Sequence, residues 1–171
     1  ARTEAPISVD TQSARVLASA LQAGADILND VSACRDPEMR QVLHSGPVPV
    51  ILMHMQGTPI DMQARPDYPR GVVATVQDFF RERLQVLASW GIEASRTILD
   101  PGIGFGKRLQ HNWELIRSIE VFLELGRPIY IGASRKGFIQ KSLRGSGSDS
   151  IGSEVEDQDL VVEALIGRLR A

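Results

Sequence analysis

The 171-residue chain has one cysteine, few aromatic residues (5%) and a formal net charge of only -2. The single cysteine, Cys34, excludes an internal disulfide framework, and we interpret it as a small buried apolar side chain rather than a nucleophile. Nucleic acids and anionic membranes recruit strongly basic surfaces. The near balance of charge therefore predicts no nucleic-acid partner and no membrane partner.

Long apolar runs are also missing. No window holds the roughly 18 apolar residues that a membrane-spanning helix needs, and residues 1–4 do not open a signal-peptide hydrophobic region. We expect a soluble, cytoplasmic protein. The chain begins with alanine rather than methionine, and its first apolar run follows almost at once. We expect that further sequence precedes residue 1.

The residues that are present favour one globular domain of the α/β class. Short apolar runs alternate with segments of helical spacing, as in a parallel sheet with right-handed crossovers. The pattern fits either an open doubly wound sheet or part of a closed eight-stranded barrel. The runs predicted to be strands are residues 6–9, 26–28, 48–53, 97–99 and 128–131.

The segments between these runs predict helices with recognisable ends. Asp10 and Thr11 are expected to cap the first helix, and residues 36–38 (Asp-Pro-Glu) to begin the second. Apolar spacing predicts a third helix from about residue 73 to Gly91, and a fourth over residues 110–125. Residues 54–71 contain three prolines, which favour a long functional loop lying over another part of the fold.

Polar side chains follow the predicted strands at the point where each apolar run stops. They are Asp10, Asn29, His54, Asp100 and the triplet 134–136 (Ser-Arg-Lys). Each residue taken alone is better explained as a helix cap or turn residue. In succession they predict a ligand site, because the carboxyl ends of parallel strands form the binding face in α/β folds.

Residues 100–107 (DPGIGFGK) form the strongest local signal. The spacing does not match a Walker A loop or a dinucleotide-binding loop. We interpret the glycines as allowing the backbone to bend around a flat ligand, with Phe105 offering a stacking surface. The alternative is a tight turn between strand and helix.

The motifs together resemble the dihydropteroate synthase family of pterin-binding TIM barrels. They are residues 7–11 (ISVDT), 29–30 (ND), 52–57 (LMHMQG), 99–107 (LDPGIGFGK) and 134–136 (SRK). The resemblance implies an incomplete TIM-type (β/α)8 barrel over residues 1–143, with about five parallel strand–helix units. We expect residues 144–156 to be a flexible linker and residues 157–171 a C-terminal helix.

The implied activity is that of a transferase in folate biosynthesis. It condenses 6-hydroxymethyl-7,8-dihydropterin diphosphate with para-aminobenzoate to give 7,8-dihydropteroate and diphosphate. The small-molecule substrates are the expected partners, and a homodimer is compatible with the resemblance. The alternatives are a catalytically silent pterin-binding fragment and a pterin-dependent methyltransferase.

By resemblance, Asp10, Asn29, Met53, Asp100 and Lys136 line the pterin pocket, with Asp100 and Lys136 as the catalytic pair. Phe105 and Ser134 belong to the aminobenzoate side. The chemistry agrees, because a carboxylate such as Asp100 can accept two parallel hydrogen bonds from the amino group and ring N–H of a pterin.

Magnesium is the cofactor that the resemblance implies. The family holds the magnesium diphosphate with an asparagine on its first strand and binds anion with an Arg-x-His element on its last strand. Neither element is visible in this sequence, so we place no metal ligand in the chain. His44, His54 and His111 lack the spacing of helical metal ligands. We therefore interpret His54 as structural.

Overall fold

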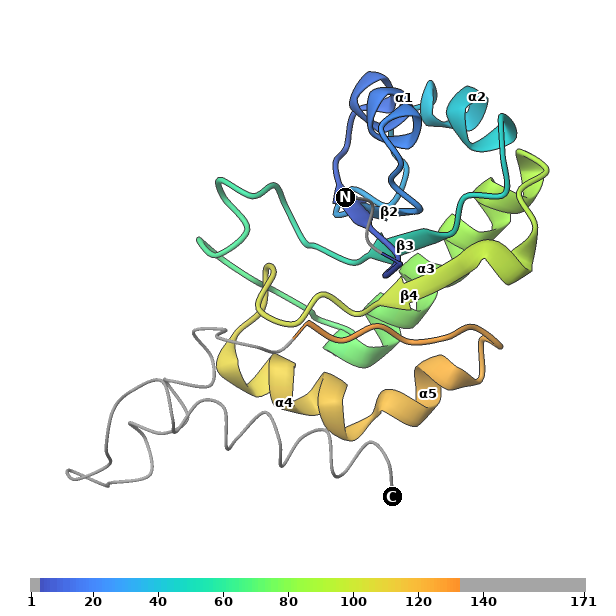
Figure 1. The fold of residues 1–171 in the computed structure, drawn as a ribbon. Coiled ribbons are helices and arrows are strands. Elements are labelled where there is room, and N and C mark those ends of the chain that lie inside the picture. The colour runs from blue at the N-terminus through green and yellow to red at the C-terminus, as the bar shows by residue number, and fades with distance from the viewer. Residues whose placement is uncertain (1–3, 133–171) are drawn as a thin grey trace.

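The computed structural model describes residues 4–132, which form one parallel sheet with helices between successive strands (Figure 1). The predicted linker (144–156), the C-terminal helix (157–171), Ser134 and Lys136 lie outside the described residues. The elements in chain order are β1 (Ser8–Asp10), α1 (Ala14–Gln22), β2 (Ile27–Asp30), α2 (Met39–His44), β3 (Val50–Met53), α3 (Val72–Ser89), the 3-10 helix η1 (Ala94–Arg96), β4 (Thr97–Asp100), α4 (Leu109–Arg117) and α5 (Ile119–Leu123).

Strand order decides between the two architectures that the sequence allows. The sheet runs β1-β2-β3-β4, and every neighbouring pair is parallel. A doubly wound sheet reverses its order at a switch point and has helices on both faces. Here the order is sequential and the connecting helices cover one face (Figure 1). The fold is therefore part of a TIM-type barrel.

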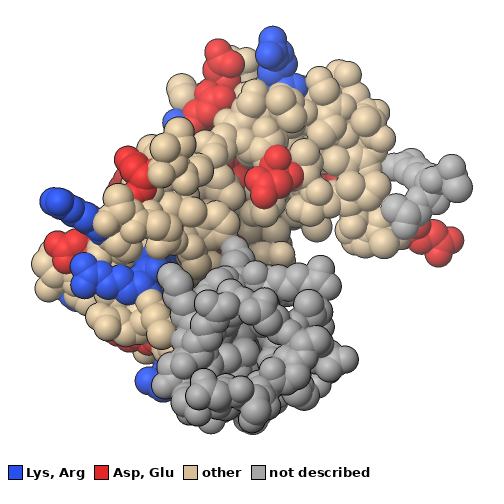
Figure 2. Space-filling view, turned by 90° about the vertical axis from the view of Figure 1, so that its left-hand side faces the viewer, with Lys and Arg blue, Asp and Glu red and all other residues tan. Residues whose placement is uncertain are grey.

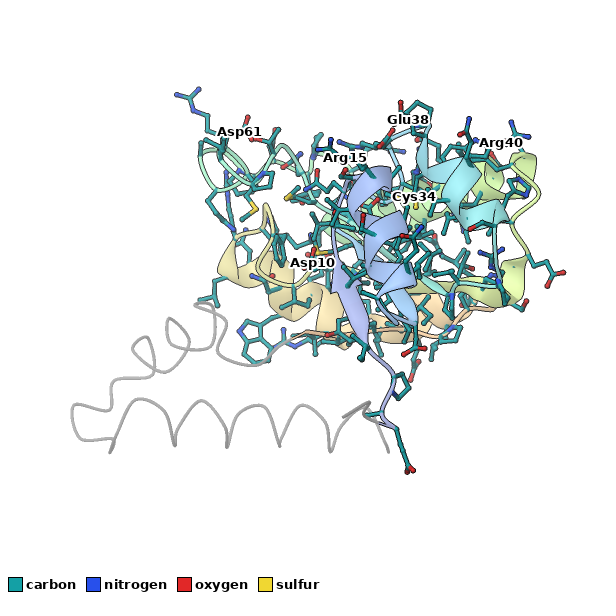
Figure 3. All side chains as sticks on the ribbon, turned by 45° about the horizontal axis from the view of Figure 1, so that its top comes forward. Asp10, Arg15, Cys34, Glu38, Arg40 and Asp61 are labelled. Atoms are coloured by element: carbon teal, nitrogen blue, oxygen red, sulfur yellow. The ribbon has the colours of Figure 1, made fainter. Side chains whose placement is uncertain are left out.

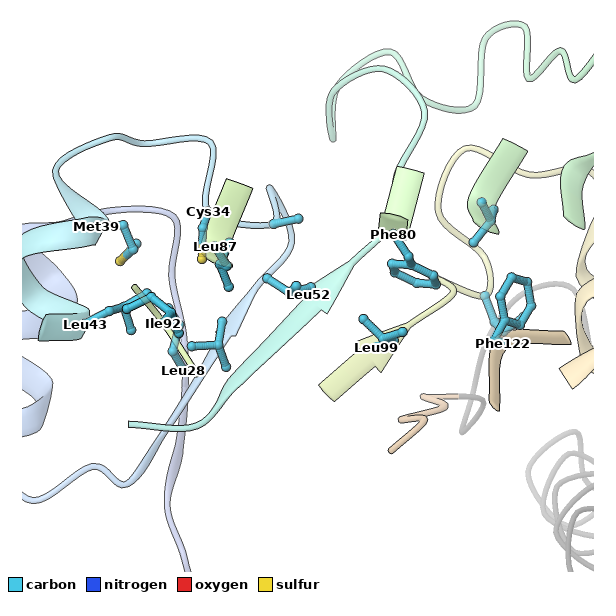
Figure 4. Packing of buried hydrophobic residues seen from close by; sticks show 14 of the residues in the cluster. Leu28, Cys34, Met39, Leu43, Leu52, Phe80, Leu87, Ile92, Leu99 and Phe122 are labelled. Carbon is cyan, nitrogen blue, oxygen red and sulfur yellow. The ribbon is translucent and has the colours of Figure 1, made fainter. Parts of the chain in front are cut away.

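The core lies between this sheet and its helices. Leu52 and Leu99 are in register on β3 and β4, Leu28 on β2 pairs with Val50, two residues before Leu52, and all three leucines are fully buried. Leu99 lies beside Phe80 of α3, whose ring meets that of Phe122 of α5 edge to face at 5.9 Å, whereas Leu28 lies near Leu43 of α2 (Figure 4). Each such side chain contributes about 1.5–3 kcal/mol when removed from water. The face of the sheet that packs against the helices thus supplies the stability.

The predicted strand at residues 128–131 is wrong in part. Ile129 forms a single parallel bridge with Leu99, and no strand is assigned there within the described residues. The Leu99 N–H donates to Pro128 O, and Tyr130 N–H donates to Leu99 O. Pro128 has no N–H with which to extend the ladder. The segment therefore lies beside β4 in the expected order but pairs over a very short length.

The predicted helix over residues 110–125 is also wrong, because α4 and α5 are separate helices. Ser118 lies between them with φ -106° and ψ 24°, outside helical geometry. No glycine or proline signals this break in the sequence. The break turns α5 so that Phe122 reaches the core.

Helix starts differ from prediction at α1 and α2. Ser13 rather than the Asp10–Thr11 pair caps α1, and its side chain accepts the Val16 N–H at 3.5 Å. The second helix begins at Met39, after a turn in which the Asp36 carboxylate accepts the Glu38 N–H at 2.9 Å. Asp10 therefore takes no part in capping α1.

Across residues 4–132, no helix combines the length and the apolar character needed to cross a bilayer. Acidic and basic side chains are interspersed on the face shown in Figure 2, with no expanse of one sign. On that face, the interspersed charges agree with the sequence-based expectation of no extended basic surface.

We predict that Gly102→Ala destabilises the chain by about 3 kcal/mol or more. Gly102 has φ +69°, a left-handed conformation that costs other residues about 1–2 kcal/mol. A Cβ at this position would also overlap the carbonyl oxygen of His54, which is backbone and cannot rotate away. Urea unfolding measures the loss.

Gly126→Ala is the matched control for this substitution. Gly126 has a similar φ of +67°, but nothing lies within 4 Å of the added Cβ. Its cost should be limited to the backbone strain of about 1–2 kcal/mol. Equal losses for the two variants would contradict the close approach of residues 102 and 54.

Candidate functional site

The register of the sheet brings four predicted site residues to one face. Asp10 pairs with Asn29, and Asn29 pairs with Ile51, which lies two residues before Met53. Met53 in turn pairs with Asp100. Because side chains alternate along a strand, residues in register or two apart share a face. Asp10, Asn29, Met53 and Asp100 therefore line the same face at the carboxyl ends of β1 to β4.

Asn29 and Asp30 are consecutive on β2, so their side chains point to opposite faces of the sheet. Asn29 faces the candidate site, and its Oδ1 is buried without a hydrogen-bond partner in the described part of the chain. An unmade hydrogen bond at a buried polar atom costs about 1–3 kcal/mol. Such an atom calls for an explanation, and a ligand donor at this position provides one.

Asp30 holds the loop that follows β2. It is fully buried, and its carboxylate accepts the Ser32 N–H at 2.7 Å and the Cys34 N–H at 2.9 Å. From the other side, the buried Arg83 of α3 donates to the carbonyl oxygens of Ala33 (2.9 Å) and Cys34 (2.8 Å). Both residues have positive φ, 55° and 57°. A buried acid and a buried base thus fix a strained loop beside the site.

Cys34 itself is buried as predicted. Burial, followed by the nearby Asp30 carboxylate, raises the pKa of its thiol well above the usual range. A thiol that stays protonated is a poor nucleophile. The interpretation of Cys34 as a packing residue is confirmed.

Asp100 ends β4 with its side chain almost fully buried (5% exposed). Its Oδ1 accepts the Gly102 N–H at 2.8 Å, which fixes the carboxylate plane at the start of the glycine-rich loop. A carboxylate offers about four acceptor positions. The bond to Gly102 uses one of these positions and orients the group for further donors on the same face.

A pocket of about 330 Å³ opens at this end of the sheet. It lies at the loops after β1, β2 and β3. Met53 lines this pocket and also belongs to the face that carries Asp10, Asn29 and Asp100. The pocket's polar lining residues are Gln12, Ser32, Arg35, Asp36 and Thr58, and its apolar lining includes Met55 and Phe79. The sequence predicted a ligand role for none of these residues: it placed Asp36 at a helix start and Met55 only within the 52–57 motif. The others belong to loops or, for Phe79, to a helix that reaches the pocket only in the fold.

Figure 3 places Asp10 on β1 and Asp61 on the loop between β3 and α3. Asp10 is exposed, in contrast to Asn29 and Asp100. Asp61 binds its own loop, accepting from the Thr58 N–H at 2.6 Å and the Thr58 hydroxyl at 2.8 Å. These hydrogen bonds lower the pKa of Asp61. Asp61 therefore organises the loop, whereas Asp10 stays exposed on the face that Asn29, Met53 and Asp100 share.

The long loop of residues 54–71 lies against the glycine-rich loop, as predicted from its prolines. The Gln63 side chain donates to Gly104 O at 2.7 Å, and the buried Tyr68 hydroxyl donates to Gly106 O at 2.7 Å. On the other side, the Asn112 side chain of α4 accepts the Gly104 N–H at 2.7 Å. The glycines thus allow close backbone packing, in addition to any role beside a flat ligand.

His54 is buried beside the same loop. Its ring meets Phe79 edge to face at 4.9 Å, and its Nδ1 lies 3.1 Å from Lys107 Nζ. An ammonium group only donates, so Nδ1 accepts and the ring proton lies on Nε2. Burial, and after it the Lys107 charge, lower the pKa of His54 to about 3. These contacts agree with a structural role for His54.

We predict that acid weakens the fold through His54. Its pKa of about 3 in the folded state lies below the ordinary 6.5, so the unfolded chain binds a proton that the folded chain excludes. The stability due to a neutral His54 is fully present above pH 6.5 and declines as the pH falls toward 3. The expected loss at pH 5 is about 2 kcal/mol. Urea unfolding at pH 5 and at neutral pH checks it.

His54→Asn isolates this effect, because asparagine keeps an acceptor near the position of Nδ1 but does not titrate. Its free energy of unfolding should depend less on pH between 6.5 and 5. Burial also lowers the pKa of His111, so His111→Gln is measured beside it. An unchanged pH dependence in His54→Asn would contradict the assignment.

The described residues do not fit a protein-held magnesium site. Magnesium prefers carboxylate oxygens and water in octahedral geometry. Within residues 4–132, no group of three or more His, Cys, Asp or Glu side chains could hold a metal ion.

Phe105 is half-buried in the glycine-rich loop, beside the face that carries Asp100. The residues of this region that sequence reasoning missed are Arg83, Tyr68 and Lys107. Lys107 stands at the end of the 100–107 motif and could have been suspected there. Arg83 could not, because its contacts with Ala33 and Cys34 span about fifty positions in the chain.

Comparison with known proteins agrees with this geometry. Residues 1–164 match the family described as "Pterin binding enzyme". A dihydropteroate synthase of Synechocystis is 42% identical over 139 residues, covering 81% of this chain and 48% of that protein. The dihydropteroate synthase of Escherichia coli K12 is 37% identical over 150 residues, covering 88% and 53%. The chain spans about half the length of the curated relatives it matches.

Solved structures show the same likeness. A Yersinia pestis dihydropteroate synthase in complex with a sulfonamide drug has a TM-score of 0.85 at 30% identity, covering 96% of this chain and 57% of the other. The Xanthomonas albilineans dihydropteroate synthase in complex with 7,8-dihydropteroate has a TM-score of 0.80 at 34% identity, covering 95% and 57%.

Proposed function

Since the chain belongs to the pterin-binding enzyme family, we propose that it is the pterin-binding part of a dihydropteroate synthase. The reaction joins 6-hydroxymethyl-7,8-dihydropterin diphosphate to para-aminobenzoate, and it yields 7,8-dihydropteroate and diphosphate for folate synthesis. The proposal includes both substrates as the partners of this site.

The observation that carries the proposal is the shared face of Asp10, Asn29, Met53 and Asp100. A pterin edge presents an amino group beside a ring N–H, which the Asp100 carboxylate can accept together. The buried Asn29 Oδ1, unpartnered among the described residues, is an acceptor for another donor of the same ring. Met53 supplies a polarizable apolar surface for the flat ring.

In this proposal, the residues bind the two substrates and stabilise charge, and they form no covalent bond with either substrate. Diphosphate leaves the pterin methylene as electron density from the ring stabilises the developing cation, and the aniline nitrogen then attacks that carbon. The protein holds the two substrates in line and needs no covalent nucleophile. In the proposal Lys136 donates to the pterin ring, and Phe105 and Ser134 form the aminobenzoate side.

Three finer features belong to the same proposal. Magnesium is proposed to accompany the diphosphate group rather than to be held by the described residues. The protein is proposed to act in the cytoplasm, which keeps thiols such as that of Cys34 reduced. A homodimer is proposed from family resemblance.

Product formation tests the function. The protein containing this chain is incubated with the pterin diphosphate, para-aminobenzoate and magnesium, and 7,8-dihydropteroate is measured by mass spectrometry. Release of diphosphate must equal product. A parallel reaction supplies a methylated pterin and a thiol acceptor instead of aminobenzoate. Methyl transfer without condensation would support the methyltransferase, and pterin binding without either product would support the silent module.

A further inference from the structure

Lys107 is a buried cation placed between two loops of the site. Its side chain is nearly inaccessible (4% exposed), and its Nζ lies 2.9 Å from Phe105 O, 3.2 Å from His54 O and 3.1 Å from His54 Nδ1. An ammonium carries three N–H donors in roughly tetrahedral directions. These acceptors belong to the loop after β3 and the loop after β4, so one side chain joins the two.

Phe105 is the residue most directly affected by this junction. Its N–H donates to Gly102 O at 3.0 Å, and its carbonyl oxygen accepts from Lys107. Its neighbours Gly104 and Gly106 both have positive φ, 83° and 60°. Glycines leave the backbone many conformations, so the orientation of Phe105 has to be imposed by its contacts. The contact from Lys107 is charge-assisted and shielded from water, and it is therefore the stronger kind.

Two other side chains hydrogen-bond to the glycine-rich loop, but at residues other than Phe105. Gln63 is exposed and holds Gly104 O, whereas Tyr68 is neutral and holds Gly106 O. Burying an ammonium costs several kcal/mol, which an apolar side chain of similar length would avoid. A buried lysine at this position therefore calls for a benefit other than packing.

We propose that Lys107 is a positioning residue for the arylamine substrate. It fixes Phe105 against the backbone of His54 and so sets the surface on which the aromatic ring of para-aminobenzoate lies. The inference rests on the proposed function. Asp100 and Asn29 stand on strands that the sheet holds independently, so pterin affinity should depend little on Lys107.

The test compares two affinities in the protein that contains this chain and in its Lys107→Met variant. Fluorescence titration gives the dissociation constant of 6-hydroxymethylpterin. Equilibrium dialysis gives that of labelled para-aminobenzoate at saturating pterin and diphosphate. We expect Lys107→Met to weaken aminobenzoate binding at least tenfold and to change pterin binding less than twofold. Arg108→Met, which removes the adjacent exposed cation, should change neither.

Each outcome has one meaning. If the unaltered chain fails to bind the pterin, the proposed function is overturned. If it binds both ligands and Lys107→Met keeps full aminobenzoate affinity, only the role of Lys107 is overturned. Should Lys107→Met lose cooperative melting, Lys107→Arg keeps the buried charge but not the geometry of the ammonium. It should weaken aminobenzoate binding selectively, and an unchanged affinity in that variant would equally overturn the role.

Discussion

Asp100→Asn should weaken pterin binding at least tenfold, which corresponds to about 1.4 kcal/mol or more. The Oδ1 of Asp100 already accepts the Gly102 N–H at 2.8 Å. An asparagine that keeps this bond must turn its amide NH2 group toward the ligand. Donors of the pterin edge would then face a donor, and the charge that assists both hydrogen bonds would be lost. Titration of a fluorescent pterin measures the change.

Asp26→Asn is a matched control for this substitution. The Asp26 carboxylate also accepts one backbone N–H, that of Ile7 at 2.8 Å, but it lies just before β2, at the opposite end of the sheet. It should leave pterin affinity unchanged. Equal affinity in Asp100→Asn and the unaltered chain would remove Asp100 from the site.

The shared face of Asp10, Asn29 and Asp100 was predictable because the signal for it is local. Each strand is a short apolar run, and the polar residue that ends it is adjacent in sequence. Once the strands are parallel, Asp10, Asn29 and Asp100 must lie at one edge. The alternation of strands and helices could not decide whether the sheet was doubly wound or part of a barrel, because the order of strands is a property of long-range pairing. Only the family resemblance predicted the barrel. The sequential order in the structure settles that question.

The errors in the sequence-based prediction have physical causes that cannot be recognised from the type of a single residue. The break at Ser118 carries no glycine or proline and arises because Phe122 packs against Phe80 in the core. The segment beside β4 forms only one bridge because Pro128 cannot donate. Lys107 and His54 meet across about fifty positions, so spacing rules could not connect them.

The supporting contacts of the site share this long-range character. Arg83 of α3 holds the loop after β2, and Tyr68 holds the loop after β4. Both act on carbonyl oxygens rather than on side chains, so neither leaves a motif in the sequence. The residues that would touch a ligand are therefore easier to predict than the residues that hold them in place.

A polypeptide limited to residues 1–171 should retain pterin recognition better than turnover. The predicted pterin-binding residues Asp10, Asn29, Asp100 and Lys136 are all present in the sequence, whereas the chain spans about half the length of its relatives. The family elements that hold the departing diphosphate, an asparagine on the first strand and Arg-x-His on the last, are not visible in this sequence. Losing such charge-holding groups typically lowers the rate about a hundredfold or more.

Grafting the corresponding flanking segments of the Synechocystis relative onto the chain provides the comparison. Turnover should rise by about a hundredfold or more on grafting, whereas affinity for 6-hydroxymethylpterin should change far less. The measurement is dihydropteroate formation by both polypeptides at matched pterin occupancy, with magnesium present. A difference confined to turnover assigns the grafted segments to the leaving group, because ground-state recognition of the ring would be common to both. Near-normal turnover by residues 1–171 alone would instead show that this chain holds the departing diphosphate with groups of its own.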